Sequence, residues 1–314
     1  MNEPTATAPS SLDAASQRLD LASPRAVAGL AHLELTARGV VEGFLIGLHR
    51  SPYHGFSAEF ADNRPYNRGD DIRFLDWKVY ARSDRLFIKQ FEEETNLRAY
   101  VLLDVSGSMA WVSEADRYPT KLAYARLLAA SLSLLLMQQG DATGLLAFDE
   151  KLRAHLAPRT TRRHWRRLLA ELEALTAEGR TEPGSALKEL SGRLQRRGLV
   201  ILLSDLLVDP DTTRTALRYL RHRGHEVMVF HIMDPGELEL PAAGEAVFFD
   251  PETGEELGTN SAALRRQYRE AVEGAIAGWR RETLRIGAEY ALITTDTPFG
   301  LALRRFLRKR SRLG

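Results

Sequence analysis

Residues 98–294 alternate between short apolar runs and amphipathic helical patterns, and this alternation restricts the possible folds more than any other feature of the chain. The apolar runs predict strands at residues 98–104, 143–148, 199–204, 226–233 and 290–294. Apolar side chains at helical spacing predict helices at residues 120–139, 162–177, 184–197, 211–223 and 261–287. Because strands and helices follow each other with short connections, we expect an α/β fold with a doubly wound, mostly parallel sheet.

Three further segments complete the predicted architecture. Residues 151–156 alternate between polar and apolar side chains, which predicts an edge strand paired with residues 143–148 as a hairpin. Residues 235–258 contain an apolar stretch followed by a Pro- and Gly-containing turn, and they predict a small hairpin insertion. Residues 298–310 predict a terminal helix.

Composition excludes several classes of protein. The 314 residues include 43 Lys and Arg against 42 Asp and Glu, a net charge of +1, so no overall field favours nucleic acid and none is expected as a partner. The chain has no cysteine, which excludes thiolate metal sites and fits a reducing cytoplasm, the predicted location. The most apolar stretch, residues 122–137, is shorter than the about 20 residues of a membrane span, and Arg126 interrupts it. It predicts a buried helix, and neither a signal peptide nor a transmembrane segment is expected.

Three oxygen-bearing side chains crowd the turn that follows the first predicted strand. Asp104, Ser106 and Ser108 lie at its carboxyl end, with Gly107 between the serines. Open α/β sheets bind ligands at this end of their strands, and carboxylate and hydroxyl oxygens suit a hard cation such as Mg²⁺. The alternative is a purely structural turn, in which Asp104 caps the next helix and the serines make local hydrogen bonds.

Two other loops are expected at the same edge of the sheet. Thr181 lies just before a predicted helix, and Asp205 ends the strand at residues 199–204. Together with the first turn they would gather two carboxylates and three hydroxyls from three loops: Asp104, Ser106, Ser108, Thr181 and Asp205.

The order of these residues resembles the von Willebrand factor type A (vWA) domain, whose metal-ion-dependent adhesion site uses the same residue types. The resemblance covers about residues 98–294 and implies a Rossmann-like fold that binds Mg²⁺, with Mn²⁺ or Ca²⁺ as alternatives. It implies that Ser106 and Ser108 ligate the ion directly, that Thr181 binds directly or through water, and that Asp104 and Asp205 act mainly through water. Neutral direct ligands leave charge on the ion, so an acidic side chain of a partner protein would complete its shell.

The segment before the first strand is similar to the bacterial family called domain of unknown function 58. The similarity is carried by Arg64-Pro65-Tyr66, Gly69-Asp70-Asp71-x-Arg73, Asp76-Trp77 and Ala81-Arg82. It implies the fold and a partner, so the metal-dependent protein-binding module implied by the vWA resemblance would act as an adaptor or chaperone partner of a MoxR-type AAA+ ATPase. Many members of that family have membrane-spanning segments near the N-terminus, whereas none is expected in this chain.

We therefore expect four regions along the chain. Residues 1–24 are rich in Ala, Ser, Thr and Pro and predict a disordered tail. Residues 25–97 form the family-specific segment, an irregular, helical and β extension expected to pack on the main domain, with Trp77 partly buried. Residues 98–296 form the vWA-like domain, and residues 297–314 a basic terminal helix.

Alternatives to the adhesion-type module remain open at this point. A carboxylate beside Mg²⁺ also occurs in phosphoryl-transfer enzymes, so a metal-dependent phosphoesterase is the alternative function. The predicted turn lacks a second Asp two residues after Asp104, and the chain has no GxxxxGK[ST] phosphate loop, so we expect a non-enzyme. A scaffold with a vestigial metal site is the third possibility.

Two charged clusters also have two interpretations each. Asp76, Arg82, Asp84 and Arg85 are either an acid–base site or, as we favour, an ion-pair network that holds an irregular segment. The basic residues 303–312 are either a surface for acidic lipid or nucleic acid or, as we favour, the solvated face of a helix.

Overall fold

The computed structural model describes residues 32–49, 64–66, 80–82, 85–88, 97–178, 192, 194, 196–207, 210–240, 245–249 and 256–310. The chain divides into two compact units, one of residues 1–46 with 97–314 and the other of residues 47–96. Several predicted features lie outside the described residues. They are the tail at residues 1–24, the site residue Thr181, the residues Asp76, Trp77 and Asp84, and most of the helix at residues 184–197.

A six-stranded sheet forms the centre of the larger unit. Its strands are β3 (Arg98–Asp104), β4 (Ala142–Phe148), β5 (Leu152–Arg159), β6 (Leu199–Ser204), β7 (Glu226–Met233) and β10 (Glu289–Thr294). They are ordered β10-β7-β6-β3-β4-β5, and every neighbouring pair is parallel except the antiparallel hairpin β4–β5. The predicted mostly parallel sheet with one hairpin edge is thus confirmed.

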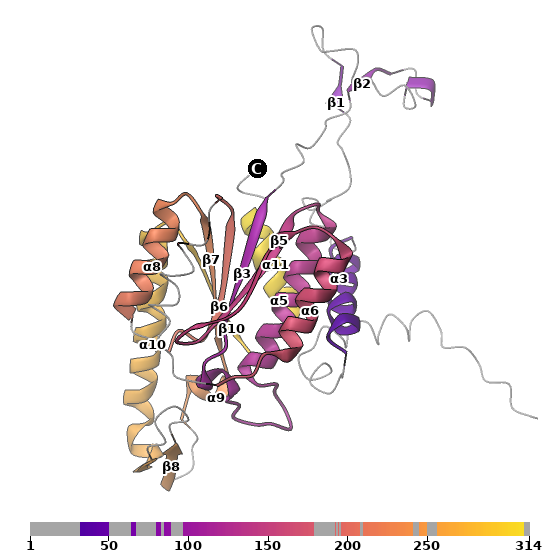
Figure 1. The fold of residues 1–314 in the computed structure, drawn as a ribbon. Helices are drawn as coiled ribbons and strands as arrows, with labels where there is room; N and C mark the ends of the chain where they lie inside the picture. The colour runs from indigo at the N-terminus through magenta and orange to yellow at the C-terminus, as the bar shows by residue number, and fades with distance from the viewer. Residues whose placement is uncertain are drawn as a thin grey trace, which may run out of the picture. The chain divides into compact units, whose positions relative to one another are not determined.

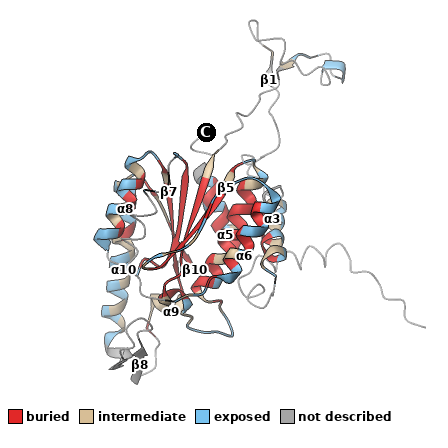
Figure 2. Ribbon diagram, in the orientation of Figure 1, coloured by how far each residue is buried: buried red, intermediate tan, exposed pale blue. Residues whose placement is uncertain are grey.

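The strands at the centre are buried on both sides. Leu102 of β3 lies opposite Leu146 of β4 and Leu202 of β6, and all three are almost completely buried. Strands covered on both faces read as continuous apolar runs, which is why these segments show no alternation in the sequence. Figure 2 shows the resulting buried layer, with the exposed residues on the outer faces of the helices.

Helices cover both faces of the sheet (Figure 1). On one face lie α3 (Leu33–His49), α5 (Lys121–Gln138), α6 (Arg162–Ala174) and α11 (Phe299–Arg310), and on the other lie α8 (Pro210–His222) and α10 (Ser261–Arg285). The Tyr124 ring of α5 stacks on Phe299 of α11 with centroids 4.5 Å apart. The Arg38 guanidinium of α3 lies 5.0 Å from the centre of the Trp165 ring of α6. Both contacts join helices of the same layer.

The helix α5 is buried around nearly its whole circumference. Leu128 and Leu132 are completely buried, as are the polar residues Ser131 and Ser133. The Thr120 side chain accepts a 3.1 Å hydrogen bond from the Ala123 amide and caps its first turn. The sequence prediction of a buried helix is confirmed, and no helix among the described residues is long and apolar enough to cross a membrane.

Short elements complete the described chain. A 3₁₀ turn, η2 (Gly107–Ala110), follows β3, and the single-turn α9 (Pro235–Leu238) follows β7. The predicted insertion is the antiparallel hairpin of β8 (Glu245–Phe249) and β9 (Glu256–Asn260). In the smaller unit, β1 (Arg64–Pro65) pairs with β2 (Phe87–Ile88) in antiparallel fashion.

Candidate metal-binding site

The Asp104 carboxylate ends β3 and is completely buried. Its Oδ1 accepts a 3.0 Å hydrogen bond from the Ser106 amide, which closes the turn. Its Oδ2 accepts a 2.6 Å hydrogen bond from the Ser204 hydroxyl at the end of β6. Asp104 therefore binds both its own turn and the neighbouring strand, as expected where parallel strands end at one edge of a sheet.

The two serine hydroxyls of the turn face each other. Ser106 Oγ and Ser108 Oγ lie 3.1 Å apart, and both side chains are buried. Adjacent oxygens in an octahedral shell with bonds of about 2.1 Å lie about 3.0 Å apart. The spacing of the hydroxyls thus matches two neighbouring ligands of a magnesium ion.

Asp205 follows β6 and is also buried. Its Oδ2 accepts a 2.7 Å hydrogen bond from Lys121 Nζ, and its Oδ1 accepts a 3.2 Å bond from the Leu207 amide. Leu206 between them has a φ of 53°, a left-handed conformation that branched and bulky residues rarely adopt. The Leu206 amide donates a 2.9 Å hydrogen bond to Ser204 Oγ, so side-chain contacts hold this strained turn in place.

The ammonium of Lys121 connects Asp205 with α9. Lys121 is the first residue of α5 and is fully buried, and its Nζ also donates to Glu237 Oε1 at 2.5 Å. Glu237 Oε2 accepts a 2.7 Å hydrogen bond from the Asp234 amide, and the two residues form the capping box of α9. One carboxylate oxygen of Glu237 thus caps α9, and the other accepts a hydrogen bond from Lys121.

Burial and mutual repulsion shape the acidity of these groups. Burial, with the negative charge of Asp205, raises the pKa of Asp104 to about 7, although hydrogen bonds from Ser204 and Ser106 counteract the rise. Burial opposes the charge of Lys121, but Asp205 and Glu237 together raise its pKa above its ordinary value. Burial raises the pKa of Glu237 as well, while Lys121 lowers it. Because the pKa of this buried carboxyl is about 7, Asp104 favours binding either a proton or a cation.

The structure brings four of the five predicted ligands to one end of the sheet: Asp104, Ser106, Ser108 and Asp205. The fifth, Thr181, lies outside the described residues. Within the described part of the chain, no group of three His, Cys, Asp or Glu could hold a metal by acidic and imidazole ligands alone. The donor set of hydroxyls beside carboxylates nevertheless fits a hard cation, because every available atom is an oxygen.

Sequence analysis missed three residues of this site. Ser204 carried a signal, because it is a hydroxyl at the carboxyl end of a buried strand, one position before Asp205. Lys121 and Glu237 carried none, since they lie 116 residues apart and only the tertiary fold brings them together.

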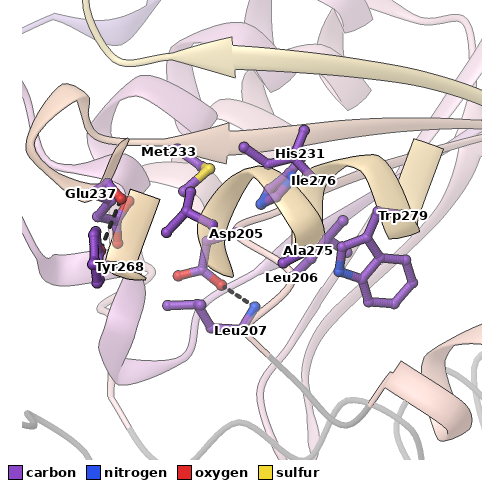
Figure 3. Close-up of a pocket in the computed structure, with 11 residues that line it drawn as sticks. Asp205, Leu206, Leu207, His231, Met233, Glu237, Tyr268, Ala275, Ile276 and Trp279 are labelled. Carbon is purple, nitrogen blue, oxygen red and sulfur yellow. Dashed lines mark hydrogen bonds between the residues drawn. The ribbon is translucent and has the colours of Figure 1, made fainter. Parts of the chain in front are cut away.

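A cavity of about 150 Å³ adjoins the site on the α10 side (Figure 3). It is lined by Asp205, Leu206, Leu207, His231, Met233, Glu237, Tyr268, Val272, Ala275, Ile276 and Trp279. Burial lowers the pKa of His231 to about 4, and its Nδ1 lies 2.7 Å from the Tyr290 hydroxyl. The imidazole is therefore neutral at physiological pH, and Asp205 lines this cavity as well as belonging to the candidate metal site.

Comparison with solved structures finds similarities at low sequence identity. The conserved hypothetical protein BatB from Bacteroides thetaiotaomicron matches with a TM-score of 0.46 and 16% identity, over 69% of this chain and 99% of that chain. The SpRpn10 VWA domain matches with a TM-score of 0.37 and 11% identity, over 67% and 94% of the two chains.

Comparison of sequences finds mycobacterial relatives. An uncharacterized protein of Mycobacterium tuberculosis strain H37Rv is 29% identical over 300 residues, which cover 94% of this chain and 93% of the relative. An uncharacterized protein of Mycobacterium avium is 31% identical over 134 residues, 42% of this chain and 78% of that protein. One family model matches residues 62–276, more than half of the chain, and the protein therefore belongs to the family described as Protein of unknown function DUF58.

Proposed function

We propose that this protein is a divalent-metal-dependent protein-binding module, with Asp104, Ser106, Ser108, Thr181 and Asp205 as its metal site. The observation that carries the proposal is the pair of buried hydroxyls, 3.1 Å apart, beside the buried Asp104. Bound Mg²⁺, or Mn²⁺ or Ca²⁺ in its place, would supply an unsatisfied positive charge at the edge of the sheet.

The residues present suit binding better than bond cleavage. Ser106 and Ser108 contribute neutral oxygens, so they quench little of a cation's charge and leave it available to an acidic side chain of a partner. Asp104 is committed to the Ser106 amide and the Ser204 hydroxyl, which positions the turn. We propose a MoxR-type AAA+ ATPase, or an acidic client protein, as that partner.

Metal binding is tested by calorimetric titration with Mg²⁺ and Mn²⁺. We expect one saturable site in the wild type, and at least a tenfold loss of affinity in the variant Ser106→Ala/Ser108→Ala. Thr215→Ala is the control, because this exposed hydroxyl donates a 2.8 Å hydrogen bond to the Asp211 carbonyl within α8 rather than to a residue of the candidate site. Absence of binding by the wild type would contradict the proposal.

Partner binding is tested by affinity capture with the wild type and the double variant, each in Mg²⁺ and in chelator, with mass spectrometry of bound proteins. We expect an AAA+ ATPase that only the wild type retains, and only in Mg²⁺. Equal retention in all four conditions would place the contact elsewhere. Release of phosphate from phosphoesters that Ser106→Ala/Ser108→Ala abolishes would assign the alternative, a phosphoesterase.

A further inference from the structure

Lys121 is a buried cation inside the candidate metal site. Its Nζ lies 2.7 Å from Asp205 Oδ2 and 2.5 Å from Glu237 Oε1, and its side chain is 0% exposed. Burying an ammonium is unfavourable unless good partners compensate for the lost water. The protein places it here between two carboxylates that come from different elements, the end of β6 and the helix α9.

Asp205 interacts with two ionisable groups, the Lys121 ammonium and the Asp104 carboxyl. On one side it binds the ammonium directly, and on the other its charge acts on Asp104, whose pKa it raises. Its second oxygen is held by the Leu207 amide, so the carboxylate is fixed in direction. Any cation bound at Asp104, Ser106 and Ser108 therefore competes with Lys121 for the same negative charge.

We propose that Lys121 is a positioning residue that holds Asp205 and thereby lowers the affinity of the site for a divalent cation, with Glu237 drawing part of the ammonium's charge away. This inference rests on the proposed metal-dependent function. Removing the lysine leaves the charge of Asp205 wholly available to the cation, so binding tightens. Removing the charge of Glu237 leaves the ammonium to Asp205 alone, so binding weakens.

The arrangement also gives the site a mechanical connection to α9. Asp234 caps this helix and accepts hydrogen bonds from the Ser113 hydroxyl and, at 2.8 Å, from the Gly236 amide. The Tyr268 hydroxyl of α10 donates a 2.9 Å hydrogen bond to the Glu237 carbonyl. Displacement of α9 by a partner would pull Glu237 from Lys121, and the site would then release its cation more readily.

The test is titration with Mn²⁺ alone, followed by electron paramagnetic resonance, at about one pH unit above the pKa of Asp104 so that proton competition is small. The variants are Lys121→Met and Glu237→Gln, and Lys151→Met is the matched control because its side chain is 74% exposed. We expect Lys121→Met to tighten Mn²⁺ binding at least tenfold, Glu237→Gln to weaken it threefold or more, and Lys151→Met to leave it unchanged.

The directions of the two changes separate this role from a merely structural one. Damage to the fold would weaken binding in both variants, whereas the proposal requires opposite signs. If Lys121→Met does not fold, the double variant Lys121→Met/Glu237→Gln buries one carboxylate fewer, and it is expected to bind Mn²⁺ at least tenfold more tightly than Glu237→Gln alone. If neither of these variants folds, an unchanged or tighter Mn²⁺ affinity in Glu237→Gln overturns the inference, and a weaker affinity with unchanged thermal stability supports it.

The outcomes also distinguish this inference from the proposed function. Binding by the wild type with an unchanged or weaker affinity in folded Lys121→Met overturns the inference alone. Binding only in Lys121→Met supports the inference and overturns metal dependence of the wild type. Absence of Mn²⁺ binding in the wild type and in both Lys121 variants overturns both.

Discussion

The Ser204 hydroxyl donates a 2.6 Å hydrogen bond to the Asp104 carboxylate and links the carboxyl ends of two neighbouring strands. The same oxygen accepts the Leu206 amide, so one hydroxyl bridges the candidate metal site and the strained turn after β6. This bridge makes Ser204 a sensitive position for mutation.

Ser204→Ala is expected to reduce stability by about 1–3 kcal/mol, because it leaves a buried carboxylate and a buried amide short of a partner. Loss of the donor also raises the pKa of Asp104 further, so the affinity for Mg²⁺ at pH 7 falls and recovers at higher pH. Chemical denaturation and calorimetry measure the two effects. Ser131→Ala, which removes another buried hydroxyl, serves as control, and an equal loss of Mg²⁺ affinity there would contradict this explanation.

The affinity for Mg²⁺ should depend on pH through Asp104. Because the pKa of this carboxyl is about 7 without metal, the cation must displace a proton at lower pH. We expect the affinity to fall by up to about tenfold per pH unit below 7 and to level off above it. Calorimetry in buffers of different ionisation enthalpy would detect the released proton. A flat profile from pH 5 to about 8 would exclude Asp104 as the titrating group.

The stability of the metal-free protein should also depend on the ionisation of Asp104. It should fall as pH rises, whereas the affinity for Mg²⁺ should rise. The pKa of Asp104 is about 7 when folded and 3.8 in its ordinary state, so between these values the folded protein holds a proton that the unfolded chain has released. The contribution of Asp104 to the free energy of unfolding is therefore present at low pH and is lost as pH rises to about 7. Thermal denaturation in chelator, wild type against Asp104→Asn, measures the difference. If the melting temperatures of the wild type and of Asp104→Asn changed in parallel with pH, the contribution of Asp104 would be refuted.

The turn at Leu206 offers a test of backbone strain. Leu206 is buried, so truncation to Ala is expected to cost about 2–5 kcal/mol of stability. Leu206→Gly loses the same packing but adopts a φ of 53° without steric cost, so it should be more stable than Leu206→Ala by about 1 kcal/mol. Denaturant midpoints of the two variants measure this difference. A lower stability for glycine would show that the turn is not strained.

The apolar side of the basic terminal helix α11 should contribute to the packing of the core. Within α11, Phe306 and Leu307 are buried whereas Arg304 and Arg305 are exposed. Deletion after Leu303 should therefore destabilise the protein by several kcal/mol through loss of the two apolar side chains, whereas Arg304→Gln should change stability by less than about 0.5 kcal/mol. Thermal denaturation of both variants measures this. If the deletion and Arg304→Gln changed the stability by similar amounts, α11 would contribute little to the packing of the core.

The sheet was predictable because its central strands are buried on both faces and give continuous apolar runs, whereas α6 and α8 are buried on one side and repeat apolar residues at helical spacing. The turn of Asp104, Ser106 and Ser108 was predictable because these residues lie within five consecutive positions of the chain. Lys121 was not, since a lysine at the first position of a helix is usually solvated, and only the fold encloses it with Asp205 and Glu237. Within α3, the buried residues Ala37, Val40 and Phe44 recur at helical spacing along one side of the helix.

The long separations within the site have a consequence for the order of folding. Asp104 bonds a residue 100 positions later, and Lys121 bonds one 116 positions later. Contacts of such separation form only after the intervening chain has been synthesised and has collapsed, and nascent chains emerge from the ribosome with their N-terminus first. The site therefore assembles only once β6, β7 and α9 are in place, so a partner of the kind proposed would bind only molecules in which these elements have folded.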